Sequence, residues 1–135
     1  MDFNSSAELL SVGVGGTICL VDDDPSMLKA LDRLLSAVGF QAQLFHEPLE
    51  FLSYASCHSV TLAVIDIWMP GISGLATQQT LQTVSPNTRV IIITANDDAW
   101  VRDAAIRAGA IGFFVKPFDD ETFLAAVHQA MASGT

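Results

Sequence analysis

The chain of 135 residues carries 15 Asp and Glu against 6 Lys and Arg, for a formal net charge of −9, and half of it is hydrophobic. Nucleic-acid binding draws its affinity largely from basic side chains on phosphates, so this balance predicts no direct DNA or RNA binding. No apolar stretch reaches the roughly 18 residues that span a bilayer, and Cys19 and Cys57 make no disulfide framework, so we expect one cytoplasmic domain outside the membrane.

The first residues differ in character from the rest of the chain. Residues 1–16 contain Asp2 and Glu8 but no Lys or Arg, unlike the positively charged start of a secretory signal. We interpret them as a flexible N-terminal extension. The folded domain is expected over residues 17–132, with 133–135 as a C-terminal tail at the start of a linker to an output domain.

The first half of the domain predicts alternating strands and helices. A helix is expected to begin at Pro25, with Asp24 as its cap, and to end at Gly39. Its apolar residues Leu28, Leu31, Leu35 and Val38 recur at helical spacing. Strands are expected over 18–21, 41–45 and 62–65. A second helix is expected over 48–56, and its inward-facing residues are Leu49, Phe51 and Leu52.

The second half continues the alternation. A turn-rich loop over 69–74 leads to a helix over 75–83. Strands are expected near 89–93 and over 112–115, with a helix between them that Gly109 closes. A last helix begins near Asp119, and its inward-facing residues are Phe123, Val127, Ala130 and Met131.

This alternation predicts an α/β fold of the doubly wound, flavodoxin-like (βα)5 kind, with a parallel sheet between two helix layers. Five such strands most often take the order 2-1-3-4-5, numbered along the chain. Ligands of open α/β sheets bind beyond the carboxyl ends of the strands, where the order reverses. Here that point lies between the strand ending in Asp22-Asp23 and the strand ending in Asp66.

Four strand ends carry the chemistry. Asp22, Asp23 and Asp66 would repel one another unless a cation joins them, and hard carboxylate oxygens suit Mg²⁺ or Mn²⁺. Thr94 adds a hydroxyl and Lys116 an ammonium, which together meet the needs of phosphoryl transfer to a carboxylate. Singly, each residue has a simpler explanation: an Asp as a helix cap, Thr as a strand end, Lys as a solvated side chain. Their joint occurrence at successive strand ends favours a site.

Four motifs carry a family resemblance over residues 17–131. As they stand here they are Val21-Asp22-Asp23-Asp24, Ile65-Asp66-Ile67-Trp68-Met69-Pro70-Gly71, Ile93-Thr94-Ala95 and Val115-Lys116-Pro117-Phe118. In number and order they resemble the receiver domain of two-component response regulators. The resemblance implies a protein that catalyses only its own phosphorylation and dephosphorylation, and so no enzyme in the ordinary sense.

The resemblance also implies a role for each residue. Asp66 would be the phosphoacceptor, and Mg²⁺ would be held by Asp22, Asp23, Asp66 and the backbone carbonyl of Trp68. Thr94 would bond the phosphoryl group and Lys116 would pair with it, next to a cis bond to Pro117. Phe113 matches the aromatic switch position, whose ring fills the space that Thr94 leaves when it moves towards the phosphoryl group.

The partners follow from the same resemblance. A sensor histidine kinase would phosphorylate Asp66, and the change would spread to the face formed by the fourth helix, the fifth strand and the last helix. Phosphorylation would allow a homodimer through that face or through the first and last helices. Residues 21–51 resemble receivers that precede a LuxR-type helix-turn-helix output, the nitrogen-fixation regulator group. The alternatives are a stand-alone receiver that acts by protein–protein interaction, or a phosphorelay member.

Two other classes remain weaker. A Mg²⁺-dependent phosphohydrolase of the haloacid-dehalogenase kind needs a second Asp two residues after its nucleophile, and Trp68 occupies that position. A nucleotide or flavin binder on this topology needs a Gly-rich or Ser/Thr-rich loop after the first strand, which the sequence lacks. Trp68 itself suggests a further hypothesis, that its indole covers the acyl phosphate and slows attack by water.

Overall fold

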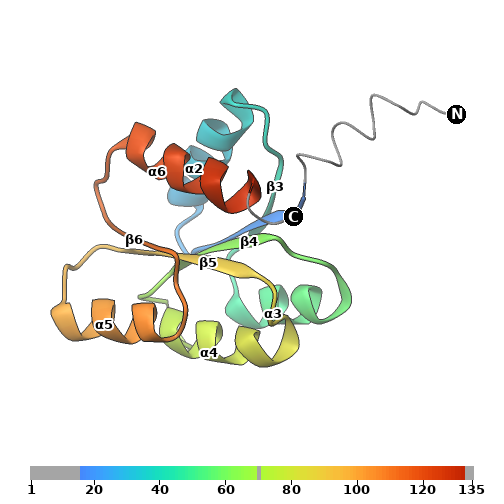
Figure 1. The fold of residues 1–135 in the computed structure, drawn as a ribbon, viewed down its shortest axis with the longest axis vertical. Helices are drawn as coiled ribbons and strands as arrows, with labels where there is room; N and C mark the ends of the chain where they lie inside the picture. The colour runs from blue at the N-terminus through green and yellow to red at the C-terminus, as the bar shows by residue number, and fades with distance from the viewer. Residues whose placement is uncertain (1–15, 70, 133–135) are drawn as a thin grey trace, which may run out of the picture.

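The computed structural model describes residues 16–69 and 71–132, and these form a parallel sheet between two helix layers (Figure 1). The elements in chain order are β2 Ile18–Val21, α2 Pro25–Ala37, β3 Ala42–Phe45, α3 Pro48–Cys57, β4 Leu62–Asp66, α4 Gly74–Val84, β5 Arg89–Thr94, α5 Ala99–Arg107, β6 Gly112–Val115 and α6 Asp120–Ala132. The expected flexible extension, apart from Gly16, and the expected tail at 133–135 lie outside the described residues.

The sheet has the order β3-β2-β4-β5-β6, and every neighbouring pair is parallel. This confirms the predicted doubly wound fold and its strand order. Val21 is in register with Phe45 on one side and with Ile65 on the other, so β2 and β4 end level with each other. Asp22 and Asp66 therefore follow directly from paired positions at the reversal of strand order.

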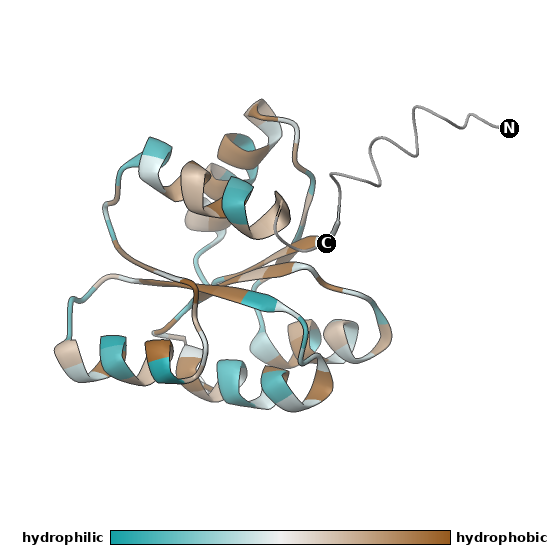
Figure 2. Cartoon of the chain, viewed as in Figure 1, coloured by the Kyte–Doolittle hydropathy of each residue, from teal (hydrophilic) through white to brown (hydrophobic). Residues whose placement is uncertain are grey.

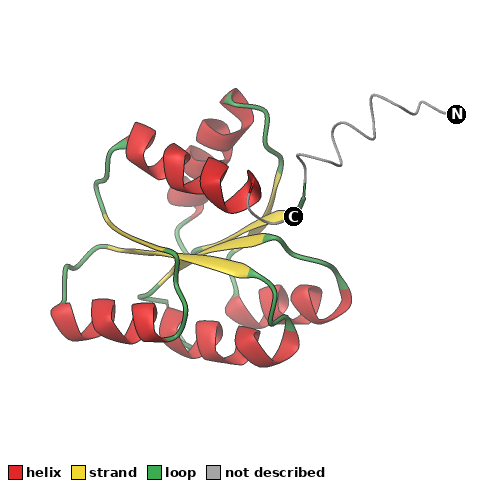
Figure 3. Ribbon diagram, in the orientation of Figure 1, coloured by secondary structure: helices red, strands yellow, loops and turns green. Residues whose placement is uncertain are grey.

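The sheet is buried on both faces because helices cover each of them. β2 and β4 are buried along their whole length, and the strands are largely hydrophobic (Figure 2). α2 and α6 cover one face, and α3, α4 and α5 cover the other (Figures 1 and 3). Near-continuous apolar strands are what a doubly covered parallel sheet requires.

The helix ends follow the local chemistry of the chain. The Asp24 side chain accepts a hydrogen bond from the Ser26 backbone N–H at 2.9 Å and so caps α2. Gly39 and Gly109, with φ of 95° and 101°, follow α2 and α5 in the left-handed conformation that glycine adopts without steric cost. Both predicted stops are confirmed.

One prediction about the core was wrong. Leu49 does not face inward, since it is 67% exposed. The buried residues of α3 are Pro48, Phe51, Leu52 and Ala55. They keep the spacing i, i+3, i+4, i+7, and Leu49 lies one residue, about 100° of helix rotation, from the start of that stripe.

α5 is held by few apolar contacts. Its buried residues are only Val101 and Ala105. Two glutamines of α4 add polar contacts at its C-terminal end: Nε2 of Gln78 donates to the Ala105 carbonyl at 3.0 Å, and Nε2 of Gln82 donates to the Ala108 carbonyl. The Ala105 carbonyl also accepts from the Ala110 backbone N–H at 3.0 Å, so the C-terminal end of α5 is held both by its own turn and by α4.

The first and last described segments meet at the edge of the sheet where the strands begin. Gly16 lies against the side chains of Thr61 and Met131, close enough that a Cβ there would come within 2.5 Å of Thr61 Oγ1. None of the described helices combines the length and the apolar character needed to cross a membrane.

Candidate functional site

Lys116 joins two of the strand-end carboxylates. Its Nζ donates to Asp22 Oδ2 at 3.1 Å and lies 3.4 Å from Asp66 Oδ1. Asp22 follows β2, Asp66 ends β4 and Lys116 follows β6, so the site is built from three strands brought to one edge. The Lys116–Pro117 peptide bond is cis. The structure therefore brings these three predicted residues together.

Asp23 completes a group of three acids. Carboxylate oxygens of Asp22, Asp23 and Asp66 all lie within 4.8 Å of one another. Asp22 is 1% and Asp66 4% exposed, whereas Asp23 is open to solvent. Asp22 Oδ1 also accepts from the Asp24 backbone N–H at 3.0 Å. This set of hard oxygen donors, open on one side, fits a divalent cation such as Mg²⁺ that retains water ligands.

The charges of the site are out of balance. Burial raises the pKa of Asp66 to about 6, with the Asp22 charge adding to the rise and Lys116 opposing it. Burial also raises the pKa of Asp22, against the Asp24 N–H and Lys116. Burial alone would lower the pKa of Lys116, but the two carboxylates outweigh it and raise that pKa. The single ammonium of Lys116 thus only partly offsets the charge of the three acids, and a further cation at this cluster would be favourable.

Thr94 ends β5 with a fully buried side chain whose hydroxyl is engaged by its own loop. The hydroxyl donates to the Asn96 carbonyl at 3.2 Å and accepts from the Asn96 N–H at 3.2 Å. To donate to a group on Asp66, the hydroxyl must first leave Asn96. The sequence places Asn96 only among the capping residues of the following helix, although its position two residues after a strand-end hydroxyl was a signal for this contact.

Gly74 lets α4 begin against the backbone of Asp66. Its N–H donates to the Ile67 carbonyl at 2.9 Å. A Cβ at this position would lie 2.2 Å from the Asp66 carbonyl oxygen and 2.7 Å from Ile67 Cα. Only glycine permits so close an approach, whereas the sequence pattern places Gly74 simply in the turn-rich loop over 69–74.

Trp68 and Phe113 are both partly exposed. Trp68, two residues after Asp66, is 48% exposed, and its carbonyl stays a predicted metal ligand. Phe113 of β6 is half-buried and pairs in the sheet with Ile92 of β5. Ile92 lies two residues before Thr94 on that strand. The guanidinium of Arg102 lies over the Phe113 ring, 4.9 Å from its centroid, and its Nη2 is 2.5 Å from Asp97 Oδ1.

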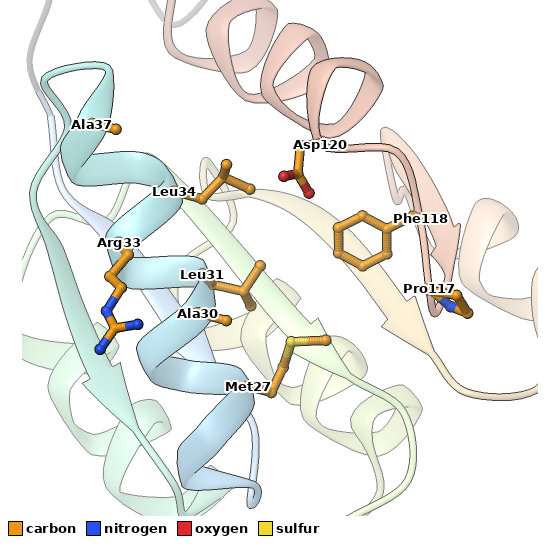
Figure 4. A pocket seen from close by; sticks show the side chains of 9 residues that line it. All are labelled: Met27, Ala30, Leu31, Arg33, Leu34, Ala37, Pro117, Phe118 and Asp120. Atoms are coloured by element: carbon orange, nitrogen blue, oxygen red, sulfur yellow. The ribbon is translucent and has the colours of Figure 1, made fainter.

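An apolar hollow of about 530 Å³ lies between α2 and the segment from Pro117 to Asp120. Met27, Leu31 and Leu34 point from α2 towards Phe118 on the other side (Figure 4). Pro117 links the hollow to the site, because it follows Lys116 directly. The hollow lies between the helices of the predicted alternative dimer surface.

Comparison with known proteins gives one consistent picture. The family model described as response regulator receiver domain matches residues 18–128. Response regulator protein TmoT of Ectopseudomonas mendocina is 34% identical over 114 residues, which cover 84% of this chain and 52% of TmoT. Transcriptional regulatory protein FixJ of Bradyrhizobium diazoefficiens is 30% identical over 116 residues, which cover 86% of this chain and 57% of FixJ. The chain thus spans about half the length of these curated relatives.

A solved structure agrees with the sequence relatives. The beryllofluoride-activated NtrC4 receiver domain dimer superposes with a TM-score of 0.83 at 27% identity, covering 88% of this chain and 98% of that one. The sheet and both helix layers are therefore shared with a receiver domain.

Proposed function

Because the chain belongs to the response regulator receiver domain family, we propose that it is switched by phosphorylation of Asp66. The observation that carries the proposal is the placement of Asp66, which is 4% exposed, ends β4 beside Asp22 and lies 3.4 Å from the Lys116 ammonium. Its pKa of about 6 leaves it mostly ionised at pH 7, as a nucleophile must be. TmoT and FixJ are regulators by name, which supports a signalling role.

The roles of the neighbouring residues follow from charge. An Asp66 carboxylate oxygen forms the new bond to phosphorus while the bond from phosphorus to its donor breaks. Lys116 orients that carboxylate and offsets the charge of the transferred oxygens. A Mg²⁺ ion held by Asp22, Asp23, Asp66 and the Trp68 carbonyl supplies further positive charge when bound.

Phosphorylation places about −1.5 to −2 charges and three acceptor oxygens at Asp66, in place of the single charge of its carboxylate. The Thr94 hydroxyl is the donor proposed to respond, by exchanging the Asn96 carbonyl for a phosphoryl oxygen. Because Thr94 and Phe113 lie on neighbouring strands, its movement opens space on the side of β5 where the Phe113 ring packs. This coupling links Asp66 to the face made of α5, β6 and α6.

We further propose that a sensor histidine kinase supplies the phosphoryl group and that the switched face forms a homodimer. Exposed Trp100, Ile106 and Ile111 on or beside α5 support this face. The hollow between α2 and α6 supports the alternative surface. The beryllofluoride-activated NtrC4 receiver is described as a dimer. It is a precedent for dimerisation but does not distinguish between the two candidate surfaces.

The output is proposed to lie in sequence other than these residues. TmoT and FixJ are about twice the length that this chain matches, and FixJ is named a transcriptional regulator. We propose that a DNA-binding output of the LuxR type is controlled in the cytoplasm by this domain. The net charge of −9 supports assigning DNA contacts to another domain. A stand-alone receiver or phosphorelay member is the alternative.

The experiment that tests phosphorylation is intact-mass analysis after incubation with Mg²⁺ and acetyl phosphate or phosphoramidate. We expect the gain of one phosphoryl group in the wild type and none in Asp66→Asn. Asp103→Asn removes an exposed acid of α5 and is the matched control, which should react as the wild type does. A gain that persists in Asp66→Asn overturns the assignment of the phosphoacceptor, and no gain in the wild type overturns the proposed switch.

A further inference from the structure

Arg102 contacts both ends of the proposed switch. Its guanidinium lies over the ring of Phe113, 4.9 Å from the centroid. Its Nη2 donates to Asp97 Oδ1 at 2.5 Å. Asp97 follows Asn96, the residue that holds the Thr94 hydroxyl. One side chain therefore joins the loop after Thr94 to the aromatic ring on the next strand.

The two contacts support each other. A guanidinium over an aromatic face is attracted by the negative charge of the ring's π system, and the planar fork of arginine suits this stacking. Arg102 is 42% and Asp97 60% exposed at the side chain, so the ion pair alone contributes little. Its effect is to fix the direction of the guanidinium. Because the Phe113 ring is half-buried, the guanidinium covers part of the ring surface that the hydrophobic core does not cover.

The setting of α5 makes this contact important. The helix buries only Val101 and Ala105, and the side-chain hydrogen bonds that it receives from α4 lie at its C-terminal end, from Gln78 and Gln82. Arg102 lies in the N-terminal half, between the Thr94 loop and β6. A displacement of that half is opposed mainly by Val101 and by the contact of Arg102 with Phe113.

We propose that Arg102 is a positioning residue, which holds the Phe113 ring in the position seen here and ties that position to the loop after Thr94. When the Thr94 hydroxyl leaves Asn96, the loop that carries Asp97 moves, the guanidinium follows Asp97 and the ring is released. Arg102 thereby sets how readily phosphorylation reaches the α5–β6–α6 face. The inference rests on the proposed phosphorylation of Asp66 and deepens it.

The test compares Arg102→Gln with Arg107→Gln. Both remove one arginine from α5, but Arg107 is exposed and, among residues 16–69 and 71–132, contacts neither an aromatic ring nor an acid. The first readout needs neither metal nor phosphoryl analogue: ring ¹³C–¹H resonances of phenylalanine-labelled protein, with Phe113 assigned by their loss in Phe113→Leu. The second readout is the affinity of Mg²⁺-saturated protein for beryllofluoride, a phosphoryl analogue.

We expect Arg102→Gln to shift the free Phe113 resonances towards those of the beryllofluoride-bound wild type. Removing a contact that favours the unbound state shifts the population towards the other state. A cation–π contact at an exposed site predicts beryllofluoride binding tighter by about two- to fivefold. Arg107→Gln should match the wild type in both readouts, and Arg102→Lys should fall between them.

Three results would overturn the inference: unchanged Phe113 resonances in Arg102→Gln, an unchanged or weaker beryllofluoride affinity, or an equal effect of Arg107→Gln. A loss of unfolding free energy in Arg102→Gln, relative to Arg107→Gln in urea, that is no larger than one cation–π contact shows that the effect is not a general loss of stability. Failure of the proposed function looks different, because wild-type protein would then not bind beryllofluoride at all, while the free Phe113 resonances would still report whether Arg102 holds the ring.

Discussion

Lys116 and Asp66 meet at the carboxyl edge of the sheet, with 3.4 Å between the Nζ of one and the Oδ1 of the other. The same ammonium also bonds Asp22, so it is the cation that both buried acids share. We expect Lys116→Met to destabilise the metal-free protein by about 2 kcal/mol at pH 8, less than the roughly 3 to 5 kcal/mol for a fully buried pair because Lys116 is 20% exposed. Urea unfolding in EDTA measures this, and at pH 5, where protonated Asp66 no longer repels Asp22, the loss should be smaller. An equal loss at both pH values would contradict the shared-charge explanation.

The stability of the metal-free protein should fall as the pH rises from about 4 to 6. Burial lifts the folded-state pKa of Asp66 to about 6 from a usual value of 3.8, so between these values the folded chain binds more protons than the unfolded chain. The contribution of Asp66 to the free energy of unfolding is therefore complete below its usual pKa and is lost as the pH rises through its folded-state pKa. Between the two pKa values the free energy of unfolding falls by roughly 1.4 kcal/mol per pH unit for one group. Asp22, whose pKa burial also raises, acts in the same direction. Urea unfolding in EDTA across this range checks the slope, and Asp66→Asn should flatten it. A stability that rises with pH would contradict the account.

Mg²⁺ should stabilise the wild type at pH 7.5 and reduce the pH slope, because a cation among the three acids favours their ionised forms. At a concentration one hundred times the dissociation constant the gain is about 2.7 kcal/mol. Thermal unfolding with and without Mg²⁺ measures the gain. Asp23→Asn should weaken it, whereas Asp103→Asn, an exposed acid outside the cluster, should leave it intact. Equal loss in both variants would point to non-specific charge screening.

Gly74→Ala should destabilise the protein by about 2 kcal/mol, because the new methyl group meets the Asp66 carbonyl oxygen at 2.2 Å and neither backbone has room to move. The matched control is Gly112→Ala, where the nearest atom is Phe114 Cε2 at 3.1 Å, part of a side chain that can turn. Urea unfolding and the rate of phosphorylation measure the effects. If Gly74→Ala proves as mild as the control, the approach of α4 to Asp66 does not shape the site.

Trp68→Ala should shorten the lifetime of phosphorylated Asp66. The indole, 48% exposed and two residues along the chain, is expected to limit the access of water to the acyl phosphate. The decay of the phosphorylated mass at constant Mg²⁺ measures the lifetime. Trp100→Ala removes an exposed tryptophan from α5 instead and should decay as the wild type does. An unchanged or longer lifetime in Trp68→Ala would dismiss the hypothesis.

The sequence was sufficient for the sheet order and for the grouping of Asp22, Asp66 and Lys116, because parallel strands bring their ends to one edge whatever fills the core. It failed for Leu49, since a residue's apolar character does not say which side of a short helix it occupies. A stripe counted from buried Phe51 and Leu52 would have excluded it.

The unpredicted parts of the site depend on three-dimensional distance. Gly74 is one of several glycines in the sequence, and only the 2.2 Å approach to Asp66 distinguishes it. Arg102 belongs to none of the sequence motifs, and its place over Phe113 depends on how α5 lies against β6. A contact between side chains on different elements produces no local pattern in the sequence. Helix caps and the alternation of strand residues do produce such patterns.

The meeting of Gly16 with Met131 has a practical consequence. α6 starts beside the acidic edge and runs back across the sheet, so both described ends of the chain leave from the opposite edge (Figure 1). A fluorescent protein or solid support attached next to Gly16 or Ala132 is thus anchored at the edge of the sheet opposite Asp66. Surface immobilisation and fusion reporters at these positions should therefore leave the proposed phosphorylation of Asp66 unhindered.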